Sequence, residues 1–119
     1  MKMMTQGNAA TAEAYYRAMN SKDTAAMARH LHPDVRLVTP MEDLIGKDAV
    51  LGAARKLLPS IHSIEMQAGF ESSTQAMLVY RMRFADPIGD CRAAALLTFK
   101  DGLIAHNELF FDASPFQRT

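Results

Sequence analysis

The stretch DGLIAHNELFFDASPF, residues 101–116, decides the fold of this chain. It opens with a tight turn and continues into a strand over 103–111 whose side chains alternate between two faces. One face is almost purely apolar and carries Leu103, Ala105, Asn107, Leu109 and Phe111. The other face carries Ile104, His106, Glu108, Phe110 and Asp112. We expect the apolar face to point into the protein, which makes Asn107 the polar group that projects inward.

Three more strands are predicted before this one, over residues 61–70, 76–85 and 91–99. Short polar turns separate them, with the sequences ESSTQ, DPIGD and KDG. Four strands joined in this way form an antiparallel meander that has to bury one face. The first half of the chain is the only part available to cover that face.

The first half is predicted to be helical with one strand. Asn8 and Asp23 are suitable N-caps for two helices, and the second helix has to stop at His32 because a proline follows. A strand is expected over 35–39 and a third helix over 47–58, whose apolar residues recur at helical spacing. The expected class is therefore α+β, with helices packed on a sheet.

Composition limits the possible functions. The 119 residues fit one domain, 1–119, of which 1–8 are expected to be a flexible end. A net charge of zero argues against nucleic acid as a partner. The single cysteine, Cys91, excludes an internal disulfide, and no apolar run is long enough to cross a membrane. We expect a soluble protein of the cytoplasm.

Three segments together resemble the nuclear transport factor 2-like superfamily. They are YYRAMNSKDTAAMARHLHPDVRLVTP, IGKDAV and FKDGLIAHNELFFD, and the resemblance covers nearly the whole chain. Within that superfamily they are similar to the SnoaL-like polyketide cyclase and ketosteroid isomerase branch. The resemblance implies a cone-shaped curved sheet, mostly antiparallel, wrapped around three N-terminal helices. It also implies a deep apolar pocket and a homodimer.

The same resemblance suggests catalytic positions. It places Tyr15 where the isomerases have an oxyanion donor, although an aromatic ring at helical spacing is also typical of a core. The position of their general base holds Thr39, which cannot accept a proton at neutral pH, and their second donor falls near Ala95, which has no polar side-chain atom. A nearby loop carries Glu42 and Asp43, which are either solvated charges or a different catalytic group.

Asn107 and His106 complete the catalytic candidates. Asn107 either orients a ligand carbonyl or hydroxyl, or is a buried amide bonded to a neighbour such as Tyr15. The predicted ligand-binding residues are Tyr15, Met19, Leu37, Thr39, Met41, Tyr80, Met82, Phe84, Asn107 and Phe111. The methionines among them suit an adaptable lipophilic pocket but equally suit core filling.

His106 and Glu108 admit two interpretations. They are an acid-base pair, as in some SnoaL-like cyclases, or they lie on the outer face of the sheet. Strand alternation favours the outer face, where a homodimer interface would combine them with Arg81, Arg83 and Arg92.

No metal or cofactor is expected. The sequence has no pair of metal ligands at helical spacing, no calcium loop and no glycine-rich phosphate loop. Three functions remain open: a cofactor-independent isomerase or cyclase acting on a small polyketide-, steroid- or terpenoid-like molecule, a non-catalytic binder of such a molecule, and a homodimerisation module.

Overall fold

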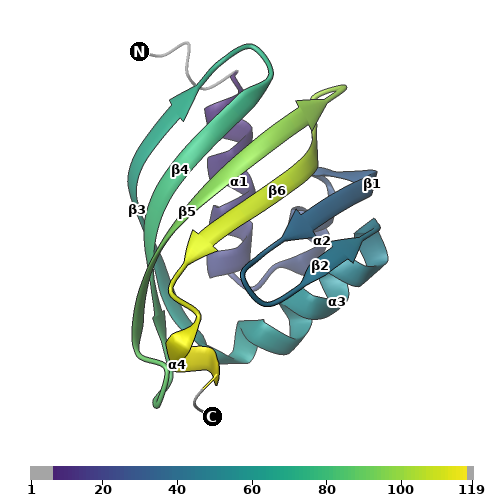
Figure 1. Cartoon of the computed structure of the whole chain (residues 1–119). Coiled ribbons are helices and arrows are strands. Elements are labelled where there is room, and N and C mark those ends of the chain that lie inside the picture. The colour runs from purple at the N-terminus through teal and green to yellow at the C-terminus, as the bar shows by residue number, and fades with distance from the viewer. Residues whose placement is uncertain (1–6, 118–119) are drawn as a thin grey trace.

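A curved six-stranded sheet packed on helices makes up the computed structural model, which describes residues 7–117 (Figure 1). The spatial order of the strands is β2-β1-β6-β5-β4-β3. Among the strands of residues 7–117 only β1 and β6 pair in parallel, so the sheet is mostly antiparallel and the α+β prediction is confirmed. The strands are β1 Leu31–Val38, β2 Asp43–Ile45, β3 Ile61–Glu71, β4 Gln75–Phe84, β5 Asp90–Lys100 and β6 Leu103–Phe111.

The helices cover the inner face of the sheet. They are α1 Asn8–Asn20, α2 Thr24–Ala28, α3 Lys47–Leu57, the 3-10 turn η2 Leu58–Ser60, and the short α4 Ser114–Gln117. Figure 1 shows the sheet curving around α1, with α3 crossing one end. Helix α1 packs on β3 and β4, and α3 packs on β1. Apolar side chains at helical spacing explain both contacts, because they place one stripe of each helix on the sheet.

The first turn of α1 is held by the β3–β4 hairpin. Its N-cap is Gly7, which has no side chain to accept a hydrogen bond. Glu71 of β3 accepts from the amide of Ala9 at 2.7 Å instead, and the Asn8 amide donates to the carbonyls of Ser72 and Ser73. The prediction of Asn8 as the N-cap was therefore wrong, since it is the first helical residue. The predicted flexible end falls largely on residues 1–6, outside the described residues.

The second helix ends earlier, and the first strand begins earlier, than predicted. Helix α2 ends at Ala28, and β1 already starts at Leu31. The reason is pairing with β6, because the His30 carbonyl accepts from the Ile104 amide at 2.8 Å. Pro33 lies where the register of that pairing shifts, which is where a strand tolerates proline.

Because of a bulge in β6, its first residues lie on the opposite face from the one predicted. The partners Thr98 and Phe99 of β5 face His106 and Ile104, so one residue of β6 is extra. Ile104 is consequently buried, although simple alternation placed it outside. Beyond the bulge the predicted alternation holds, and Asn107 points inward with 4% of its surface exposed.

Candidate ligand-binding cavity

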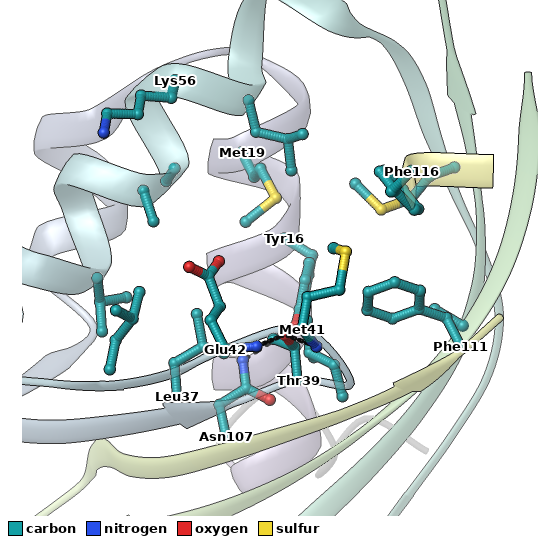
Figure 2. Close-up of a pocket in the computed structure, with 18 of the residues that line it drawn as sticks. Tyr16, Met19, Leu37, Thr39, Met41, Glu42, Lys56, Asn107, Phe111 and Phe116 are labelled. Atoms are coloured by element: carbon teal, nitrogen blue, oxygen red, sulfur yellow. Dashed lines mark hydrogen bonds between the residues drawn. The ribbon is translucent and has the colours of Figure 1, made fainter. Parts of the chain in front are cut away.

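A cavity of about 500 Å³ lies between the concave face of the sheet, α1 and α3 (Figure 2). Its walls are mainly apolar, and all ten residues predicted to bind a ligand border it: Tyr15, Met19, Leu37, Thr39, Met41, Tyr80, Met82, Phe84, Asn107 and Phe111. Their contact with a ligand stays a prediction. The structure adds residues that the sequence had not suggested as cavity walls, including Tyr16, Leu57, Cys91 and Phe116.

One buried hydrogen bond marks the polar end of this cavity. The side-chain amide nitrogen of Asn107 donates to the hydroxyl oxygen of Tyr16 at 3.0 Å, and both side chains are almost fully buried. The amide oxygen of Asn107 has no hydrogen-bond partner among residues 7–117. An unpartnered buried acceptor typically costs about 1–3 kcal/mol, so a ligand that donates to this oxygen gains affinity.

Tyr16, rather than Tyr15, is therefore the tyrosine that meets Asn107. Tyr80 packs on it with 4.7 Å between ring centroids, and the hydroxyls of Tyr16 and Tyr80 are hydrogen-bond partners. Because the Tyr16 oxygen accepts from Asn107, this hydrogen bond leaves the O–H of Tyr16 as a donor. Tyr15 contacts Tyr16 edge to face, at 5.2 Å between ring centroids.

The three tyrosine hydroxyls stay protonated at neutral pH. Burial raises the pKa of Tyr15, Tyr16 and Tyr80, because a phenolate loses its hydration in an apolar site. For Tyr16 the hydrogen bonds from Asn107 and Tyr80 oppose this effect without cancelling it. These groups can donate hydrogen bonds, but they cannot act as bases.

A tight turn at the rim of the cavity presents Glu42. The turn spans 39–42 between β1 and β2, and it closes with the Thr39 amide donating to the Glu42 carbonyl at 2.8 Å. The Thr39 hydroxyl oxygen accepts from the amides of Met41 and Glu42, each at 3.1 Å. Thr39 thus stands where the resemblance expects a base, and here it fixes the turn. Figure 2 shows Glu42 turned toward the cavity.

Two other candidate positions lie away from the cavity. Ala95 is fully buried and is not part of its wall. His106 does not border the cavity either, and it lies between Arg36 and Thr98 across the sheet. The position of His106 gives no support to a catalytic role in this cavity.

Within residues 7–117 we find no cluster of three or more histidine, cysteine or carboxylate side chains that could hold a metal. None of the helices in this part of the chain is long and apolar enough to cross a membrane.

Fold and cavity together define a protein of the nuclear transport factor 2-like class. The chain belongs to the SnoaL-like domain family, whose profile matches residues 12–107. The match includes every residue that borders the cavity except Leu109, Phe111 and Phe116.

Solved structures agree with this assignment. A protein from Kribbella flavida superposes with a TM-score of 0.87 at 27% sequence identity, covering 96% of this chain and 93% of that one. A protein named as a candidate ketosteroid isomerase from the same organism superposes with a TM-score of 0.80 at 19% sequence identity, covering 88% of this chain and 77% of that one. A candidate polyketide cyclase from Sinorhizobium meliloti superposes with a TM-score of 0.77 at 20% sequence identity, covering 84% of this chain and 93% of that one. No curated protein matches the chain.

Proposed function

We propose that this SnoaL-like protein binds a small, largely apolar molecule that carries one carbonyl or hydroxyl group. The hydrogen-bonded pair of Tyr16 and Asn107 in the wall of an apolar cavity carries this proposal. A mostly apolar cavity with a few convergent polar groups is the usual form of a small-molecule site. The names of the two structural neighbours, a ketosteroid isomerase and a polyketide cyclase, refer to ligands of this chemical kind.

The polar end offers complementary groups to such a ligand. The O–H of Tyr16 can donate to a carbonyl or hydroxyl oxygen, and the amide oxygen of Asn107 can accept from a hydroxyl. A phenol uses both contacts at once. The rest of the ligand lies against Met19, Leu37 and Met82, whose side chains exclude water and so strengthen the polar contacts.

Binding of 4-chlorophenol, compared with its isostere 4-chlorotoluene, tests the proposal. The phenol is expected to bind about 10-fold more tightly, the worth of a net hydrogen bond of about 1.4 kcal/mol. Tyr16→Phe should remove most of this preference, whereas Tyr15→Phe should retain it. Isothermal titration measures both affinities, and circular dichroism checks that each variant is folded. Equal affinity for the two compounds in the wild type would contradict the proposal.

We also propose that a second copy of the chain covers the outer face of the sheet. Cross-strand pairing places Met77 beside Leu96 and Val79 beside Ala94 there, and Phe70 and Phe110 remain 65% and 46% exposed. Charged residues border this apolar patch: Arg81, Arg83 and Arg92 lie toward one end, His106 lies toward the other, and Glu108 lies beside Leu96 on the side away from the arginines. A two-fold arrangement that turns the second copy end for end pairs the unlike ends.

The dimer predicts a change in mass on substitution at the centre of the patch. Leu96→Glu should convert a particle of two chains into one of a single chain, because burying an unpaired carboxylate in an apolar interface is costly. Light scattering after size-exclusion chromatography measures the mass. Ile45→Glu is the matched control, since Ile45 is 70% exposed on the edge strand β2 and should leave the mass unchanged. A wild-type protein that elutes as a single chain would refute the dimer.

A further inference from the structure

We infer that Phe116 sets an upper limit on the length of the ligand that the cavity accepts. The inference rests on the proposed function and adds selection by size to it. Phe116 belongs to the short helix α4, which follows the last strand of the sheet, and its side chain borders the cavity. Figure 2 shows Phe116 and Asn107 well apart on the cavity wall. A ligand bound to Asn107 and Tyr16 therefore meets Phe116 with its apolar far end.

Two aromatic rings of the cavity wall hold the Phe116 ring in place. It packs edge to face on Phe84 of β4, with 5.3 Å between the ring centroids, and on Phe111 of β6, with 5.4 Å. Edge-to-face rings attract each other beyond the effect of their burial, so this cluster forms a firm wall. Phe111 and Phe116 lie beyond residue 107, the last residue of the family match, so that match does not define this wall.

Local hydrogen bonds place Phe116 after the end of β6. The Asp112 carboxylate accepts from the amide of Ser114 at 3.0 Å, which starts the turn into α4. The Ala113 carbonyl then accepts from the amides of Phe116 and Gln117, at 3.0 and 3.2 Å. These bonds turn the chain out of the strand, so that the Phe116 ring reaches the cavity wall.

A ligand that outgrows the cavity loses affinity. Each CH2 group of an alkyl chain that is buried in the cavity raises the affinity about 4-fold, as long as there is room for it. A chain that reaches Phe116 has to displace its ring from Phe84 and Phe111, and a packed aromatic cluster does not yield without a cost. Affinity should therefore rise with chain length and then stop rising.

Titration with phenols that carry unbranched alkyl chains at position 4, from methyl to octyl, tests this inference. Phe116→Ala should move the length limit to longer chains. It should bind the first phenol beyond the wild-type limit about 10-fold more tightly than the wild type does, the effect of roughly two more buried CH2 groups. Phe116→Leu should move the limit by a smaller amount. Phe70→Ala is the matched control, because Phe70 is 65% exposed and does not border the cavity, so it should keep the wild-type limit.

The single cysteine of the chain supplies a second measurement. Cys91 is buried and borders the cavity. Ala93 pairs with Phe111, so Cys91 lies beside the segment that leads from β6 to α4. Burial raises the pKa of its thiol, and the nearby charge of Asp112 acts in the same direction, so a thiol reagent should react slowly. Phe116→Ala should react about 10-fold faster with dithionitrobenzoate, the effect expected from the loss of two edge-to-face ring contacts.

The possible outcomes separate this inference from the proposed function. Circular dichroism checks that each variant is folded. The same length limit in Phe116→Ala and the wild type would overturn the role of Phe116 and leave the proposed function standing. Unchanged reactivity of Cys91 in Phe116→Ala would show that Phe116 does not close this end of the cavity. Absence of phenol binding by the wild type at every chain length would overturn the proposed function itself.

Discussion

Leu97→Ala should destabilise the protein by about 2–5 kcal/mol, the range measured for removal of a buried leucine side chain. Leu97 lies in the middle of β5, is fully buried, and stands between Ala76 of β4 and Asn107 of β6. Its neighbour Ala76 is small and cannot fill the space that Leu97 would leave. Urea unfolding followed by circular dichroism measures the loss as a lower midpoint with an unchanged slope.

An exposed apolar residue provides the control for this experiment. Ile45 has a side chain of the same size on β2, and it is 70% exposed. Ile45→Ala should therefore cost less than about half as much, because less apolar surface is removed from water there. Equal losses for Ile45→Ala and Leu97→Ala would show that the assignment of Leu97 to the buried inner face of β5 is wrong.

Alkaline pH should unfold the protein in the same step that ionises its tyrosines. The chain has three tyrosines and no tryptophan, so phenolate absorbance reports Tyr15, Tyr16 and Tyr80 alone. Burial raises all three pKa values in the folded state, whereas an unfolded tyrosine titrates near about 10. The stabilisation from keeping these groups neutral is complete below about pH 10 and is lost as the pH rises further, because the unfolded chain then binds fewer protons.

A stepwise alkaline titration tests whether tyrosine ionisation and unfolding occur together. Absorbance and circular dichroism should change together above about pH 10, whereas protein in denaturant should titrate smoothly near that pH. Tyr15→Phe and Tyr16→Phe should each reduce the absorbance step by about one third, since each removes one of the three phenols. Ionisation of all three tyrosines near pH 10 with unchanged circular dichroism would contradict their burial.

Much of the fold could be predicted because its signals are local. The long strands of the second half alternate and are separated by polar turns, so β3 to β6 were found with small errors at their ends. The short strand β2 was missed, because three residues are too few to show alternation. The start of β1 was missed as well, since proline normally ends a strand, and here a register shift accommodates Pro33.

The residues that line the cavity were predictable from the sequence, but the hydrogen bond between Tyr16 and Asn107 was not. Tyr15 and Tyr16 are adjacent on α1, and both are buried, since neighbouring helical residues differ by only about 100° around the axis. Which of them reaches Asn107 depends on how far α1 is rotated on the sheet, and the sequence does not encode this in any local pattern. The structure selects Tyr16.

The direction of the Glu42 side chain was not predictable from the sequence either. The sequence shows that Glu42 is a carboxylate in a loop, but a loop carboxylate is equally expected to be a solvated surface charge. Its direction follows from the Thr39 turn and from the pairing of Val38 with Asp43 in a strand that the sequence did not reveal. The resemblance to the isomerases pointed to Thr39, which lies in the same turn as Glu42.

The capping of α1 by Glu71 couples folding events far apart in the chain. Residues 62 to 65 positions apart supply the hydrogen bonds of the first turn, so α1 gains them only when the β3–β4 hairpin exists. With Gly7 as its N-cap, α1 has no side chain there to accept from its first amides, and Glu71 does so instead. Tyr16 lies on this helix, so the polar end of the cavity depends on the hairpin at the opposite edge of the sheet from β2.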